Sequence, residues 1–258
     1  MKQEVAPRMS GSNADRYISG EYGTRCPCWH QDDSSWKVDQ LMQTVPAGFW
    51  QTITSAPLRV VDIGCGAGGV LGHLGRTLAA RGVTMDGVGI EIADDALALA
   101  RQAWPELAFH RRAVHELEDS YDVGLLMDIV EHVENPWQLI RDAVSRCRFV
   151  IFHIPLDDNF LTEVADLYSY KARSMGHIHF HTRRKALWLL ESNGLEVLSQ
   201  RLTPAFSVQS SRGLSAQHRM LSYPRKILAT ISPATCARWL GGMSLMVVTR
   251  PRETSGGM

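Results

Sequence analysis

The stretch VVDIGCGAGGV, from Val60 to Val70, decides the fold of this 258-residue chain. Its first half is an apolar run typical of a buried strand, and its second half is a glycine-rich turn that leads into a helix. Gly64, Gly66 and Gly69 match the G-x-G-x-x-G pattern of dinucleotide-binding turns. Asp62 stands two residues before the first glycine, where its charge would repel a pyrophosphate by about 1 kcal/mol or more. The glycine turn alone therefore does not identify the ligand that it binds.

Apolar strands alternate with helices on both sides of this turn. The strands LRVVDIG, MDGVGIE, ELAFH, YDVGLLMD and RFVIFHIP lack a polar face, and helices are predicted at 68–82, 93–104 and 135–147. Such strands are typical of a parallel sheet that helices cover on both faces. A helix at 182–194 and strands at 195–202 and 243–250 complete the pattern. We therefore predict an α/β fold with a doubly wound, Rossmann-like sheet.

The domain prediction divides the chain near residue 50. Residues 1–50 are expected to form an N-terminal extension, loose up to about residue 20 and carrying a lid helix at about 35–45. Residues 51–258 are expected to form the main domain, with insertions at about 156–176 and 203–242. A short helix is predicted inside the second insertion, at 232–241. We expect the two insertions to set the choice of substrate.

Charge and cysteine usage limit the function classes. The chain has 27 Lys and Arg against 27 Asp and Glu, and no basic patch interleaved with aromatic residues, so we expect no nucleic-acid partner. Basic residues are in excess between residues 171 and 238. This segment could face an anionic substrate or a membrane surface, or could simply be a solvated face. Five cysteines without a disulfide framework, and no signal-peptide pattern, predict a cytoplasmic protein. No apolar run is long enough to predict membrane insertion. The sequence does not decide between a monomer and a homodimer.

A second acidic residue helps to choose the ligand of the turn. Glu91 ends the second predicted strand, 22 residues after Gly69, where a carboxylate accepts the hydroxyl groups of a ribose. The ammonium group of an amino acid would be attracted to Asp62, whereas a pyrophosphate would not. Together the two carboxylates favour S-adenosylmethionine (SAM). An NAD-dependent oxidoreductase, and a cofactor-binding protein without catalysis, remain alternatives.

Four segments, in this order, resemble the motifs of the class I SAM-dependent methyltransferases. They are VVDIGCGAGG (60–69), VGIEIADDAL (88–97), YDVGLLMDIVEHVENP (121–136) and GHIHFHTRRKALWLLESNGLEVL (176–198). The resemblance covers residues 58–202 and the last strand. It implies a seven-stranded sheet of order 3-2-1-4-5-7-6 whose last strand is antiparallel. It also implies a transferase that uses SAM.

The resemblance assigns cofactor contacts by position. The methionine portion would lie along Asp62 and the turn, the ribose at Glu91, the adenine near Ile92, and the sulfonium end beside Asp128. The full set of expected cofactor residues is Asp62, Gly64, Cys65, Gly66, Glu91, Ile92, Ala113, Val114, Asp128 and Ile129. Many relatives carry an acid at the position of Ala113, so adenine would here be held by backbone or by neighbours such as Val114.

Three histidines are candidates for catalysis. A hydroxyl acceptor must lose its proton, and His, Asp or Glu usually takes it. His132, just after the fourth strand, is the leading candidate. Phosphoethanolamine methyltransferases, which the chain resembles here, pair a histidine at this position with an N-terminal tyrosine, so Tyr17 or Tyr22 would be the partner. His153 and His177 are a second base and a pocket residue, with structural packing as the alternative for each.

Aromatic residues before the first strand are expected to cover the site. Trp29, His30 and Trp36 would form a lid that excludes water, with plain packing as the alternative. Asp157 would contact a substrate hydroxyl or amine, or lie in a solvated turn.

The sequence predicts no metal site. The alternating His177, His179 and His181, and the cluster Cys26, Cys28 and His30, both lack the ligand spacing of a structural zinc site.

The expected reaction is methyl transfer to an oxygen or nitrogen of a small polar metabolite. The histidines favour oxygen. The segments WHQDDSSWK and LGGMSLMVV resemble an uncharacterised bacterial subgroup associated with saccharide and secondary-metabolite genes. That resemblance suggests a saccharide or natural-product intermediate as the acceptor.

Overall fold

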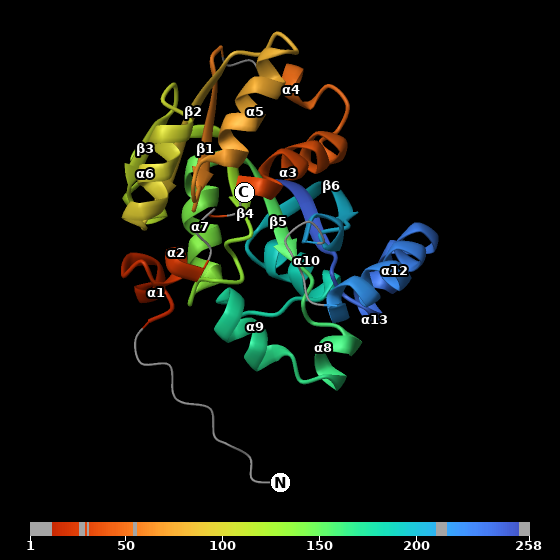
Figure 1. Cartoon of the computed structure of the whole chain (residues 1–258). Coiled ribbons are helices and arrows are strands. Elements are labelled where there is room, and N and C mark those ends of the chain that lie inside the picture. The colour runs from red at the N-terminus through yellow and green to blue at the C-terminus, as the bar shows by residue number, and fades with distance from the viewer. Residues whose placement is uncertain (1–11, 26–28, 30, 54–55, 210–215, 253–258) are drawn as a thin grey trace, which may run out of the picture.

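A computed structural model describes residues 12–25, 29, 31–53, 56–209 and 216–252 and shows one seven-stranded sheet (Figure 1). The strand order is β3-β2-β1-β4-β5-β7-β6, with β7 antiparallel to both of its neighbours and the other pairs parallel. The strands are β1 (Leu58–Ile63), β2 (Met85–Glu91), β3 (Ala108–Arg111), β4 (Tyr121–Met127), β5 (Cys147–Pro155), β6 (Leu195–Thr203) and β7 (Ser244–Pro251). The predicted fold class and strand order are confirmed.

Helices connect and cover these strands. Those before β4 are α1 (Asp15–Ile18), α2 (Glu21–Arg25), α3 (Gln31–Thr44), α4 (Phe49–Thr52), α5 (Gly69–Ala79), α6 (Asp94–Ala103) and the 3₁₀ helix η1 (Val114–Glu116). Those after it are α7 (Pro136–Arg146), α8 (Phe160–Val164), α9 (Tyr168–Met175), α10 (Arg183–Ser192), α11 (Phe206–Gln209), α12 (Ala216–Ile231) and α13 (Pro233–Trp239). Figure 1 shows α1, α2 and α9 gathered below the sheet, away from α4 and α5.

Two apolar cores lie on the two faces of the sheet. Because successive side chains of a strand point to opposite faces, Val60 packs in one core and Val61 in the other. The first core joins the strands to α3, α5 and α6, and the second joins them to α7 and α10. Val38 and Leu41 of α3 are fully buried in the first core, so residues before 50 take part in it. The domain boundary near residue 50 stays a prediction.

Capping residues fix the helix ends that the sequence predicts. Asn135 caps α7 by accepting a hydrogen bond from the backbone of Gln138, and Pro136 occupies the first turn, where its missing N–H costs nothing. Thr182 caps α10 in the same way through Lys185. These caps confirm the predicted helix starts to within a residue.

Two parts of the chain differ from the sequence-based expectation. The prediction of a loose segment up to about residue 20 is wrong for residues 12–20: α1 is packed there, with Asn13 and Arg16 buried. A buried Arg16 donates hydrogen bonds to the carbonyls of Ala172 and Arg173, which anchors α1. The sequence also did not predict α12, because Pro224 interrupts its helical pattern.

None of the helices within the described residues is both long enough and apolar enough to cross a lipid bilayer.

Leu41→Ala tests whether α3 belongs to the core. Leu41 is fully buried, and replacing a buried leucine with alanine costs about 2–5 kcal/mol of unfolding free energy. We expect a loss in that range in the single main transition, measured by urea denaturation. Asp39→Ala, on the exposed side of the same helix, is the control and should cost far less. A main transition that Leu41→Ala leaves unchanged would mean that α3 folds apart from the sheet.

Candidate functional site

The glycine turn and Glu91 are joined by backbone hydrogen bonds at the carboxyl ends of β1 and β2. The carboxylate of Glu91 accepts from the N–H groups of Gly66 (3.1 Å), Ile92 (2.7 Å) and Ala93 (3.1 Å). Burial raises the pKa of Glu91, and these three N–H groups act against that rise. The carboxylate is thus held rigidly at the edge of the sheet where doubly wound folds bind their ligands.

Glycine is required at Gly64. Its φ of +71° lies in the left-handed region, and a Cβ there would come within 2.3 Å of Cδ1 of Ile129. The turn after β1 and the turn after β4 therefore lie against each other. Both turns carry residues that the sequence predicts at the cofactor, Gly64 and Ile129.

Asp62 lies in β1, two residues before Gly64, and is almost completely buried, with 2% of its surface exposed. Burial raises the pKa of Asp62 to about 7, while the ammonium of Lys37 lowers it and the charge of Glu91 raises it further. Asp62 therefore changes its charge near neutral pH.

A buried network of charges links α3 to β4 and β5. Nζ of Lys37 lies 2.8 Å from Oδ2 of Asp128, and Nδ1 of His153 lies 2.5 Å from Oδ1 of the same carboxylate. Burial opposes ionisation, but His153 and Lys37 hold the pKa of Asp128 well below its ordinary value. Nε2 of His153 lies 3.0 Å from the hydroxyl of Thr203, so both ring nitrogens of this histidine are engaged.

Asp128 adopts an uncommon backbone conformation. Its φ is +56° although it is not a glycine, a geometry that persists only where surrounding contacts fix it. Its backbone N–H donates to the carbonyl of His153 (2.9 Å), and its side chain is fixed by Lys37. The ring of Trp36 meets that of His153 edge-on at 6.0 Å. The chain after β4 is thereby turned toward the site.

Aromatic side chains of the N-terminal segment cover the glycine turn. Tyr22 and Trp29 are buried and pack together against Ala67 and Ala93. A Cβ on Gly66 would lie 3.6 Å from the carbonyl oxygen of Trp29. His30, the other expected lid residue of this segment, lies outside the described residues.

The remaining expected cofactor residues border the same edge. Arg112 donates its backbone N–H to the carbonyl of Glu91 (3.1 Å), which brings the following Ala113 and Val114 beside the second strand. Val114 is buried at the start of η1, and the backbone N–H of Ala113 is bonded to Glu116. Ile92 is half-buried next to Glu91. Burial raises the pKa of the Cys65 thiol well above its ordinary value, so this side chain is no thiolate.

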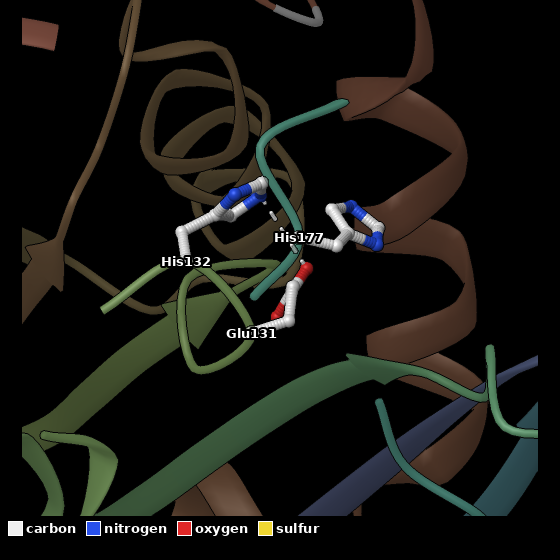
Figure 2. Close-up of side chains that lie close together, drawn as sticks. All are labelled: Glu131, His132 and His177. Carbon is white, nitrogen blue, oxygen red and sulfur yellow. Dashed lines mark ion pairs between the residues drawn. The ribbon is translucent and has the colours of Figure 1, made fainter. Parts of the chain in front are cut away.

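Glu131, His132 and His177 meet beside the turn after β4 (Figure 2), and Tyr17 joins them through His132. The hydroxyl of Tyr17 lies 2.9 Å from Nδ1 of His132, and the carbonyl of Gly176 lies 3.1 Å from the same nitrogen. The rings of His132 and His177 meet edge-on with centroids 4.8 Å apart. The structure thus joins Tyr17 to His132 through that hydrogen bond, and the ring of Tyr22 meets that of His132 edge-on at 6.5 Å.

Glu131 is the unexpected member of this cluster. It is 1% exposed, and neither carboxylate oxygen has a hydrogen-bond partner among the described residues. Oε1 lies 3.7 Å from Nε2 of His132. Burial raises the pKa of Glu131 well above its ordinary value, and the carboxylates of Asp128 and Asp157 add to the rise.

Asp157 lies behind His177. Its Oδ2 is 2.7 Å from Nδ1 of His177, and its Oδ1 is paired with Nζ of Lys171. Burial opposes ionisation, but the hydrogen bond from His177 and the charge of Lys171 hold the pKa of Asp157 well below its ordinary value. Asp157 is therefore a buried anion that orients His177.

The sequence predicted Lys37 only as part of the lid segment, not as the partner of Asp128, and gave no site role to Glu131 or Lys171. Each becomes relevant only through a partner distant in the chain, and one sequence contains no signal for such a contact. Glu131 was within the recognised motif, but its lack of partners is a property of the fold.

The sequence comparisons agree with this geometry. A family profile described as "Methyltransferase domain" matches residues 31–200. The ubiquinone biosynthesis O-methyltransferase of Rickettsia bellii is 29% identical over 100 residues, which are 35% of this chain and 38% of that protein. The enzyme of the same name from Bordetella parapertussis is 28% identical over 154 residues, 55% of this chain and 60% of that protein. The chain therefore spans about two fifths to three fifths of these relatives.

Solved structures show the same fold. The magnesium protoporphyrin IX methyltransferase of Synechocystis PCC 6803, with bound S-adenosylhomocysteine (SAH), gives a TM-score of 0.55 at 16% identity, over 88% of this chain and 86% of that chain. The [4+2]-cyclase SpnF gives a TM-score of 0.54 at 14% identity, over 84% and 80% of the two chains. Because the second neighbour is named for a different reaction, the fold alone does not define the chemistry.

The chain belongs to the methyltransferase-domain family. Its fold is that of the class I SAM-dependent methyltransferases, so the predicted family and the predicted cofactor are confirmed. The nicotinamide alternative for the glycine turn is set aside.

The pH dependence of stability tests the burial of Asp62. Its pKa rises from 3.8 to about 7 in the folded protein, so the folded state binds this proton more tightly than the unfolded state. The stability that this proton contributes is complete below about pH 4 and is lost as pH rises through about 7. Without cofactor, the unfolding free energy of the wild type should therefore fall more steeply than that of Asp62→Asn between about pH 5 and 8. Urea denaturation across this range measures it, and parallel profiles would contradict the assignment.

Proposed function

We propose that this protein is a SAM-dependent methyltransferase that acts on an oxygen of a small polar acceptor. The observation that carries the proposal is the group formed by the half-buried Tyr17 and His132 and the buried Glu131, beside the turns expected to hold the cofactor. An amine acceptor needs only to be neutral, whereas a hydroxyl must also lose its proton. Side chains placed to activate a hydroxyl therefore favour oxygen over nitrogen as the acceptor atom.

The residues present fit the cofactor. Glu91 offers a rigid, buried carboxylate to the ribose hydroxyls, and Asp62 becomes an anion near neutral pH, which suits an ammonium group. Gly64 and Gly66 let the backbone approach the methionine portion closely. Ile92, Ala113 and Val114 are proposed to border the adenine. When bound, SAM supplies an electrophilic methyl group, so the protein mainly positions the acceptor and excludes water.

We place the acceptor hydroxyl at His132. Tyr17 and the carbonyl of Gly176 fix the ring through Nδ1, and Nε2 faces Glu131. His177 borders the same pocket, and Asp157 positions it. His153 has both nitrogens engaged and 1% of its surface exposed, so we assign it the positioning of Asp128 rather than contact with the acceptor.

Tyr22, Trp29 and the expected lid residue Trp36 have a covering role in this proposal. Tyr22 and Trp29 pack over the glycine turn, and water must leave a methyl-transfer site before the hydroxyl attacks. A saccharide or natural-product intermediate is the acceptor class that we propose. The alternative of a SAM-binding partner without catalysis predicts cofactor binding with no turnover of any acceptor.

Calorimetric titration with SAH, and with NADH as the control ligand, tests the cofactor site. We expect SAH to bind and NADH not to bind. Glu91→Ala should weaken SAH by about 1–3 kcal/mol, because the ribose hydroxyls lose their acceptor. Far-UV circular dichroism of the variant checks that the turn still folds. NADH binding alone, or unchanged SAH affinity in Glu91→Ala, would contradict the assignment.

His132→Ala tests the acceptor site. It should leave SAH affinity within about twofold and slow methyl transfer about a hundredfold or more, as the loss of a group that activates the hydroxyl would. Tyr17→Phe, which removes only the hydroxyl that orients the ring, should slow transfer less. Mass-shift detection of methylated candidate acceptors provides the rate. Full activity of His132→Ala would reduce this residue to a packing role.

A further inference from the structure

The carboxylate of Glu131 needs a partner that the surrounding side chains do not supply. Both of its oxygens are buried without a hydrogen bond among the described residues, and an unpaired polar group costs about 1–3 kcal/mol, more when it is charged. Figure 2 shows this carboxylate pointing toward the rings of His132 and His177, which come from two distant segments. One ligand atom from each of the three residues lies within 4.8 Å of the other two.

Hydrogen bonds orient both imidazoles as metal ligands. Nδ1 of His177 contacts the carboxylate of Asp157, and Nδ1 of His132 contacts the carbonyl of Gly176. The carboxylate of Asp157 only accepts, so that contact places the proton of His177 on Nδ1 and leaves the lone pair on Nε2. A proton on Nδ1 of His132 satisfies the carbonyl of Gly176, with the hydroxyl of Tyr17 as a second acceptor at 2.9 Å, and this tautomer also leaves the lone pair on Nε2. A histidine that donates Nδ1–H to a carboxylate or carbonyl is the arrangement found behind metal ligands.

The backbone brings the two segments together without help from an ion. The N–H groups of Ile178 and His179 both donate to the carbonyl oxygen of Glu131, at 2.9 and 3.1 Å. The side-chain amide of Asn13 donates to the carbonyls of both His132 and Gly176 and so ties the N-terminal segment to the same two turns. The cluster is therefore built into the fold. Ligands of a tetrahedral zinc ion lie about 3.3 Å apart, which small side-chain rotations would achieve from the present spacing.

Resting on the proposed function, we propose that Glu131, His132 and His177 bind a divalent transition-metal ion that activates the acceptor hydroxyl. Two imidazoles and one carboxylate form the donor set of catalytic zinc and non-haem iron(II) sites, with positions open for a further oxygen. Magnesium, which prefers oxygen ligands, fits this set poorly.

The chemistry needs no oxidant or reductant. The acceptor oxygen binds the ion, its O–H bond breaks with the electron pair staying on the oxygen, and the proton leaves to solvent before the aromatic cover excludes water. His132 activates the hydroxyl as a ligand of the ion, so the expected effect of His132→Ala is unchanged. The metal-bound oxygen then attacks the methyl carbon: the O–C bond forms as the C–S bond breaks, and the sulfur keeps that electron pair and leaves as SAH.

Zinc titration of the untagged full chain tests the site. We expect one Zn²⁺ per chain, visible absorption bands when Co²⁺ is added instead, and no heat from Mg²⁺ at the same concentrations. Glu131→Gln and His177→Ala should each abolish tight zinc binding. Asp157→Asn, which changes only the group behind His177, should weaken it about 10- to 100-fold. His110→Ala, an exposed histidine on β3, should bind zinc as the wild type does.

The outcomes separate this inference from the proposed function. No zinc binding to the folded wild type, or equal zinc binding by Glu131→Gln, His177→Ala and the wild type, would overturn the metal site even if SAH binds. Zinc binding without SAH binding would leave the metal site standing and contradict the methyltransferase. Activity that survives complete chelation would overturn the role of the ion in activating the hydroxyl. Thermal unfolding of each variant confirms that it is folded.

Discussion

The buried ion pair between Lys37 and Asp128 is the contact on which the geometry of the site depends. It joins α3 to the end of β4, and His153 extends it to β5 and, through Thr203, to β6. Removing either partner should cost less than the ~3–5 kcal/mol of an isolated buried pair, because Lys37 also pairs with Asp33 at 3.1 Å and Asp128 also pairs with His153. The network therefore holds Asp128 in its left-handed conformation, and this sets the direction in which the chain continues to Glu131 and His132.

The two halves of the site are built differently. The proposed cofactor half would lie at the turns after β1 and β2, which adjoin in the sheet and need few side-chain contacts to stay in register. The proposed acceptor half would combine α1, the turn after β4 and the segment after α9, which are held by Asn13 and by backbone bonds to Glu131. A site of the second kind depends on tertiary contacts, so it tolerates less change in its supporting residues.

This difference explains what the sequence could predict. The strands are continuous apolar runs, and the turn at Gly64 has a local signature, so the sheet could be located from the sequence alone, whereas the cofactor residues stay a prediction. The partner of His132 was found only through a family resemblance, which left Tyr17 and Tyr22 open. The ion pair of Lys37 and the unpartnered carboxylate of Glu131 could not be predicted, because they depend on residues distant in the chain. The prediction missed α12 because Pro224 lies inside it, and an interior proline is normally a sign that a helix ends or kinks.

The place of Tyr17 has an evolutionary consequence. The match to the family begins at residue 31, whereas the hydroxyl that orients His132 comes from α1, before that point. Two chains can therefore share the whole recognised region, and with it the cofactor turns, while their N-terminal helices present different side chains to the acceptor. Substrate range in such proteins is free to diverge by exchange of a short leading segment, with the inherited core left unchanged.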